Sequence, residues 1–119
     1  FITTGVMTQL AIEASKKLNK DKNINCGVIH LGTVKPLDKD ILLKWIPKVK
    51  KIVTVEENVL LGGFGSSILE FINDNFPEHS KKISRIGLKD NFIEKYGNQD
   101  LLFKDNNLTV KNLIKEILK

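Results

Sequence analysis

This chain of 119 residues has one cysteine, three prolines and no long apolar run. A single cysteine cannot form an internal disulfide, so Cys26 indicates a reducing compartment and a buried structural thiol. No segment approaches the ~20 apolar residues of a membrane-spanning helix. No basic and apolar leader opens the chain either. We therefore expect a soluble protein with no membrane partner.

Arginine is nearly absent, although the chain is basic. The net charge of +5 is carried by 18 lysines and Arg85. Nucleic-acid-binding surfaces commonly use arginine for bidentate phosphate and base contacts, together with stacking aromatic side chains. Scattered lysines favour a solvated surface over a nucleic-acid interface.

The length fits one domain, residues 1–119, with a single packed core. The chain shows no repeat, low-complexity tract or internal linker. It begins on Phe1-Ile-Thr-Thr4, inside an apparent strand and without an initiator methionine. We therefore expect a fragment of a longer polypeptide.

Strand and helix patterns alternate along the chain. Strands are predicted at 2–4, 25–31, 51–55 and 83–86, with a short edge strand over Phe92-Ile-Glu94. Helices are predicted at 7–19, 39–46, 65–76, 99–103 and after Thr109. This order and right-handed crossovers predict a three-layer α/β/α domain with a mostly parallel sheet of four to five strands.

Local signals place the helix ends and buried faces. Asp38, Asn98 and Thr109 are predicted N-caps. Ser67-x-x-Glu70 offers a capping box, although the preceding glycines could start that helix earlier. The apolar stripe predicted for the second helix consists of Ile41, Leu42, Trp45 and Ile46.

The glycine cluster that follows the third strand invites a phosphate-loop interpretation. In Gly63-Phe-Gly65-Ser-Ser-Ile68, however, isoleucine replaces the third glycine of a dinucleotide fingerprint, and no Walker-type Gly-Lys-Ser/Thr is present. The helix N-terminal amides from Gly63 to Ser66 remain anion-site candidates. The favoured alternative is that glycine lets the helix approach the sheet closely.

Glu56, Glu57 and Asn58 follow the same strand. Adjacent strand residues point to opposite faces, so the two carboxylates are poor candidates for one acid–base pair. A solvated or helix-capping role is favoured, and Glu57 and Asn58 are candidates for an interface or cleft. The chain contains no residue that we assign as catalytic, cofactor-binding or metal-ligating.

The two histidines show no ligand spacing with each other or with Cys26. We expect His30 to be a satisfied strand histidine and His79 to lie on the surface. The segment Thr3-Thr-Gly5 ends its strand at the same sheet edge as Glu57, which allows a small polar site there.

The motifs Val34-Lys-Pro-Leu-Asp38, Val53-Thr-Val-Glu-Glu57 and Gly62-Gly-Phe-Gly-Ser66 resemble the C-terminal domain of transketolase-type, thiamine-diphosphate-dependent enzymes. The resemblance covers nearly the whole chain. The segment Ile86-Gly-Leu-Lys-Asp-Asn-Phe-Ile-Glu94 is more similar to the 1-deoxy-D-xylulose-5-phosphate synthase branch. Lys89 departs from the proline usual there, and Thr3-Thr-Gly5 is closer to transketolase.

The resemblance implies a parent enzyme that uses thiamine diphosphate and Mg²⁺ to decarboxylate pyruvate and join its two-carbon fragment to glyceraldehyde 3-phosphate, for isoprenoid precursor synthesis. The cofactor supplies that carbanion chemistry. The metal–diphosphate signature, Gly-Asp-Gly followed by Asn, is absent here. The implied partners are the preceding domains of the same polypeptide and a second subunit in a homodimer, in the cytoplasm or a plastid stroma.

Two alternatives remain open on the residues. One is the C-terminal domain of a transketolase or of a 2-oxoacid dehydrogenase beta subunit. The other is a free-standing small-anion-binding α/β module that uses Gly63, Gly65 and Ser66.

Overall fold

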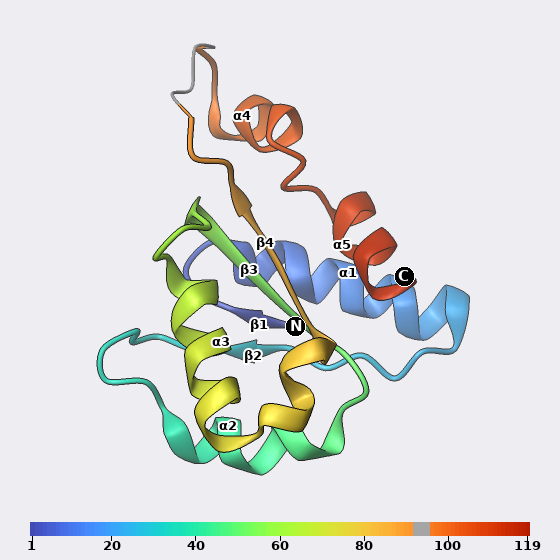
Figure 1. Ribbon diagram of the computed structural model, residues 1–119. Helices are drawn as coiled ribbons and strands as arrows, with labels where there is room; N and C mark the ends of the chain where they lie inside the picture. Colours follow the sequence, from blue (N-terminus) through green and yellow to red (C-terminus); the bar gives the residue numbers. More distant parts are fainter. Residues whose placement is uncertain (92–95) are drawn as a thin grey trace.

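The computed structural model describes residues 1–91 and 96–119. Strands and helices alternate through most of the chain (Figure 1). Their order is β1 (Ile2–Thr3), α1 (Met7–Lys22), β2 (Ile29–His30), α2 (Lys39–Trp45), η1 (Ile46–Lys48), β3 (Ile52–Val59), α3 (Phe64–Asn75), η2 (Pro77–Lys82), β4 (Ile83–Leu88), α4 (Gln99–Asp105) and α5 (Val110–Ile117).

The strands form one parallel sheet in the order β2-β1-β3-β4. The chain moves from β1 outward to β2, then crosses back to place β3 on the other side of β1. Open α/β sheets bind ligands outside the carboxyl ends of their strands, at the point where the order reverses. In this sheet that point lies between β1 and β3. The predicted α/β fold is confirmed.

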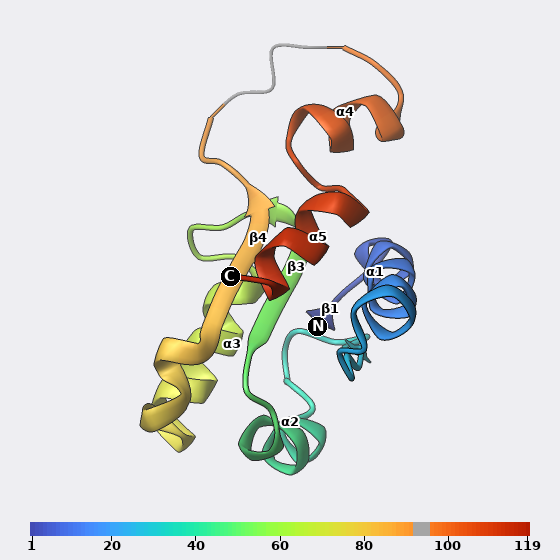
Figure 2. The ribbon, with the colours of Figure 1, turned by 90° about the vertical axis from the view of Figure 1, so that its right-hand side faces the viewer.

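Helices cover both faces of the sheet. Figure 2 shows α1 and α5 on one side, with α2 and α3 on the other. The core follows the alternation of β3, because Val53 and Val55 pack with α1 and α5 while Ile52 packs with α2 and α3. Thr54 and Glu56 share the face of Ile52 and therefore point toward α3.

Several predicted boundaries shift, and three of the shifts are the largest. Helix α1 continues to Lys22, because Asn23 ends it in the left-handed conformation (φ 53°) and donates its N–H to Leu18 O. Strand β2 is two residues long, since its neighbour β1 is equally short. Strand β3 continues to Val59, because Val59 still pairs with Leu88 of β4 after an irregularity in register.

One further prediction is wrong and another is not tested. Trp45 is 43% exposed rather than buried, while Leu42 and Ile46 are fully packed. The Trp45 ring lies beneath the ammonium groups of Lys44 and Lys48, at 5.6 and 5.3 Å from its centroid. The predicted strand over 92–94 lies outside the described residues. None of the described helices has the length and apolar composition of a membrane span.

Candidate functional site

The predicted site residues meet where β3 ends and α3 begins, at the carboxyl edge of the sheet. Glu56 and Glu57 point in opposite directions, as the alternation requires. Glu56 is completely buried, whereas Glu57 is exposed. One carboxylate therefore lies in the protein interior and the other in solvent, and the two do not form a pair.

Glu56 caps α3. The N–H of Phe64 donates to Glu56 Oε2 and the N–H of Gly65 donates to Oε1, each at 2.7 Å. A carboxylate is favourable at a helix N-terminus, where it satisfies amides that have no partner inside the helix. The helix starts at Phe64, so the predicted Ser67–Glu70 capping box is wrong. The Glu56 carboxylate, from the preceding strand, caps the helix instead.

Close packing explains the glycines of this loop. A Cβ atom on Gly65 would lie 2.6 Å from Thr54 Oγ1 and 2.9 Å from Glu56 Oε1. A Cβ atom on Gly63 would overlap the Glu56 carboxylate and the Val59 carbonyl. The absence of side chains at Gly63 and Gly65 therefore lets α3 approach β3, as the favoured interpretation of the cluster expected.

The first four amides of α3 already have partners. Glu56 accepts from the first two, and Gly63 O accepts from the N–H groups of Ser66 and Ser67 at 3.1 and 3.3 Å. An anion would have to displace a buried carboxylate to reach these amides. Glu56 therefore already holds the amides of Phe64 and Gly65, two of the groups that an anion at this loop would use.

Arg85 fastens the loop from the neighbouring strand. Its Nη1 donates to Leu60 O at 3.0 Å and to Ser66 Oγ at 2.7 Å, and Ser66 Oγ also donates to Leu60 O. Sequence reasoning missed this role. The register that sets Thr54 beside Arg85, and so turns Arg85 toward α3, exists only in the folded sheet.

Glu57 and Asn58 remain on the surface. Glu57 Oε1 accepts a hydrogen bond of 3.1 Å from Gln99 Nε2, which links the end of β3 to α4. This contact is solvent-exposed and is of the kind that contributes little stability. Both residues are therefore available to a covering surface.

A second polar group lies at the ends of β1 and β2. Thr8 Oγ1 lies 2.9 Å from Thr3 Oγ1 and 2.8 Å from His30 Nδ1. The predicted polar group at Thr3 thus extends to Thr8 and His30 rather than to Glu57. His30 has a partner, as expected, but its side chain is exposed.

Beside His30 lies an open hollow of about 350 Å³. Its lining is His30, Leu31, Gly32, Thr33, Pro36, Leu37 and Asp38. Asp38 is also the N-cap of α2, since its Oδ1 accepts from Ile41 N–H at 3.2 Å. Within the described part of the chain, no three His, Cys, Asp or Glu side chains are grouped to hold a metal ion.

Two predicted environments are wrong. His79 is buried, 7% exposed, because η2 folds back and sets its ring edge-on to Phe76. Its Nδ1 lies 3.2 Å from Lys82 Nζ. Cys26 is only partly buried, since it lies in the exposed segment before the short β2. Burial is still the main influence on its thiol and raises the pKa of Cys26.

The fold is a parallel α/β domain, and the glycine loop between β3 and α3 lets the helix pack closely on the sheet. The chain belongs to the family described as transketolase, C-terminal domain, whose profile matches residues 1–113.

Curated relatives that match nearly the whole chain are enzymes of the transketolase type. The 1-deoxy-D-xylulose-5-phosphate synthase of Clostridium tetani is 41% identical over 118 residues, which are 99% of this chain and 18% of that protein. The synthase of Clostridium perfringens strain 13 is 38% identical over 120 residues, 98% of this chain and 19% of that protein. The chain thus spans about a fifth of the length of these relatives.

A solved structure agrees with the fold. The protein titled "Split gene transketolase, inactive beta4 tetramer" matches with a TM-score of 0.83 and 27% identity. The match covers 96% of this chain and 36% of that chain. The parallel sheet and its helical layers are thus those of a transketolase-like domain.

Proposed function

We propose that this chain is the non-catalytic C-terminal domain of a thiamine-diphosphate-dependent transferase, a 1-deoxy-D-xylulose-5-phosphate synthase. The observation that carries the proposal is the 38–41% identity to such synthases over nearly the whole chain, at about a fifth of their length. The parent enzyme condenses pyruvate with glyceraldehyde 3-phosphate and releases carbon dioxide, as a cytoplasmic homodimer with thiamine diphosphate and Mg²⁺.

The glycine loop at the start of α3 does not fit the cofactor. A diphosphate needs free hydrogen-bond donors, and the amides of α3 that resemble a phosphate loop are bound to Glu56. The described residues also offer no acidic cluster for the magnesium ion. In this proposal, other parts of the parent polypeptide carry the chemistry and this domain contributes packing.

Within that role, the candidate residues divide into two groups. Gly63, Gly65 and Ser66 act inside the domain, since they hold α3 against the sheet. Glu57 and Asn58 are exposed at the carboxyl edge and are the interface candidates. They face the preceding domains or the second subunit.

The test uses the full-length gene product that contains these residues. Purified protein with thiamine diphosphate and Mg²⁺ is supplied with pyruvate and glyceraldehyde 3-phosphate, and carbon dioxide release is measured with and without the aldehyde. Release that requires both substrates supports the proposal. A full-length protein without this reaction, but with transketolase or 2-oxoacid dehydrogenase activity, overturns the synthase assignment.

A further inference from the structure

Helix α4 contacts the rest of the domain on one side, where Phe103 packs against the core between α1 and α5. In Figures 1 and 2 the helix lies beyond the carboxyl end of β4. None of its described residues, 99–105, is buried, whereas α5 immediately after it buries Leu113 completely. Its hydrogen bond to the sheet, from Gln99 to Glu57, is solvent-exposed.

A helix of two turns needs packing to persist. Isolated helices shorter than about 12–15 residues are marginal in water. The N-cap bond from Leu101 N–H to Asn98 Oδ1, 3.0 Å, supplies only part of the required stability. Helix α4 is therefore short of the tertiary contacts that stabilise other helices of this domain.

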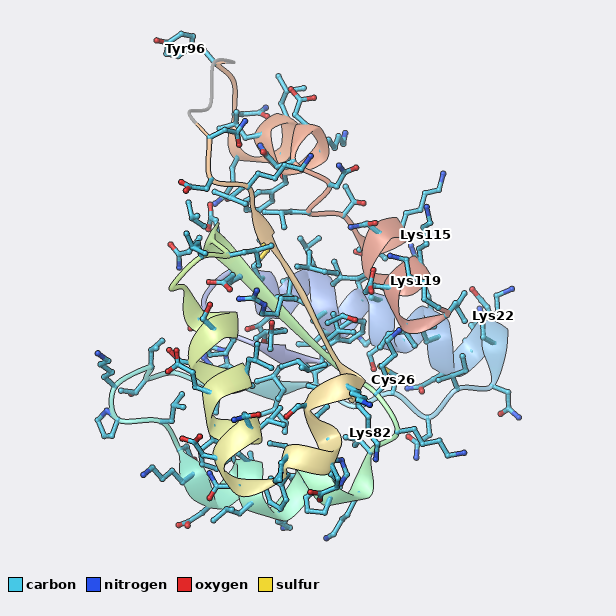
Figure 3. All side chains as sticks on the ribbon, viewed as in Figure 1. Lys22, Cys26, Lys82, Tyr96, Lys115 and Lys119 are labelled. Carbon is cyan, nitrogen blue, oxygen red and sulfur yellow. The ribbon has the colours of Figure 1, made fainter. Side chains whose placement is uncertain are left out.

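Exposed apolar side chains lie at the carboxyl end of the sheet, on α4 and in the loop after β3. Leu101 is 46% exposed and Tyr96, just before the helix, is 98% exposed. Figure 3 shows Tyr96 at the outermost end of the molecule, pointing away from the sheet. Leu61, in the loop that follows β3, is 78% exposed.

We propose that α4, with Tyr96 and Leu61, is the docking surface for an apolar face of the preceding domains of the same polypeptide. The proposal rests on the proposed function, because it needs a parent chain. Relatives at 38–41% identity carry about four-fifths of their length outside the matched region. Such a chain has ample surface to cover α4.

The size of this surface favours a tethered partner over a second copy of the domain. A stable interface between separate proteins buries about 800 Å² on each partner. A seven-residue helix and two flanking side chains are too small for that. A domain on the same polypeptide binds at an effective concentration of the order of millimolar, so a small apolar contact suffices.

Photocrosslinking in the full-length protein tests the docking surface. p-Benzoylphenylalanine replaces Leu101 in one variant and Tyr96 in another, and mass spectrometry identifies the crosslinked peptides. Trp45 is the matched control position, because it is 43% exposed and lies on α2 at the opposite end of the molecule. We expect crosslinks from 101 and 96 to the preceding domains, at least tenfold above those from 45.

The outcomes separate this inference from the proposed function. Crosslinks from 101 and 96 to α4 of a second copy, or no excess over position 45, overturn the docking surface. Thiamine-diphosphate-dependent turnover of the unmodified protein is measured in parallel. Turnover without crosslinks removes only the docking surface, while crosslinks without turnover remove only the enzyme assignment. Because Tyr96 is almost fully exposed, its replacement removes no packing within the domain, and a failure to fold cannot explain a missing crosslink at that position.

Discussion

Glu56 shows how one buried carboxylate can replace a local helix cap. Its two oxygens accept from the first two amides of α3, and no solvent reaches it. Without Glu56, the N–H groups of Phe64 and Gly65 would be buried without an acceptor, which costs free energy. The carboxylate therefore links β3 to the start of α3.

Replacing Glu56 with glutamine should lower the free energy of unfolding. A glutamine side chain presents one oxygen and one NH₂ group, so one buried amide loses its acceptor, at a cost of about 1–3 kcal/mol. Urea denaturation followed by circular dichroism measures the change. The control is Glu57→Gln, which alters an exposed neighbour and should stay within about 0.5 kcal/mol. Equal effects at both positions would contradict the capping role.

Cys26 should react slowly with alkylating reagents at neutral pH. Burial raises the pKa of its thiol, and only the thiolate is nucleophilic. Because the folded protein disfavours the thiolate, the rate of iodoacetamide labelling should reach half its maximum at a higher pH in the folded protein than in urea. Coincident pH profiles would show that the fold does not affect the thiol.

At the scale of elements, the contact between α3 and β3 depends on the absence of side chains at two positions, Gly63 and Gly65. Gly65 lies against Thr54, Glu56 and Arg85. Gly27, by contrast, is exposed, and a Cβ atom added there would have nothing within 4 Å. An added methyl group would therefore clash at Gly65 and would have free space at Gly27.

Gly65→Ala should destabilise the domain by about 1–3 kcal/mol, the usual cost of overpacking. Its Cβ would lie 2.6 Å from Thr54 Oγ1, so the helix must shift and the Glu56 hydrogen bonds must lengthen. Gly27→Ala is the control and should be neutral or slightly stabilising. Thermal unfolding of both variants distinguishes them. A neutral Gly65→Ala would mean that α3 tolerates displacement from the sheet.

At the scale of the whole molecule, the domain is a three-layer support with its polar side chains directed inward at the α3 junction and outward at Glu57 and Asn58. In the proposed parent enzyme, Glu57 and Asn58 would be available for contacts with other domains. Because Glu56 accepts hydrogen bonds from the amides of Phe64 and Gly65, these two groups are not free to bind a phosphate.

The isolated 119-residue chain should therefore bind no thiamine diphosphate. Isothermal titration with cofactor and Mg²⁺ is expected to give only heats of dilution. The full-length gene product, titrated under the same conditions, is the positive control. Saturable micromolar binding by the isolated chain would contradict the assignment of this domain as non-catalytic.

The sequence alone determined the fold class, the family resemblance and several helix ends. Alternating patterns reveal strands and helices because burial imposes a period on the chain. Caps such as Asp38 and Thr109 act over three residues, so the sequence contains the whole interaction. The glycine cluster could likewise be interpreted as close packing.

Only the tertiary structure decided which groups those residues meet. Glu56 reaches amides eight and nine residues away, and Arg85 reaches Ser66 across nineteen, because parallel pairing of β3 and β4 sets them on one face. His79 is buried and Trp45 exposed for a similar reason. Burial depends on which element packs over a residue, and such long-range contacts leave no local pattern in the sequence.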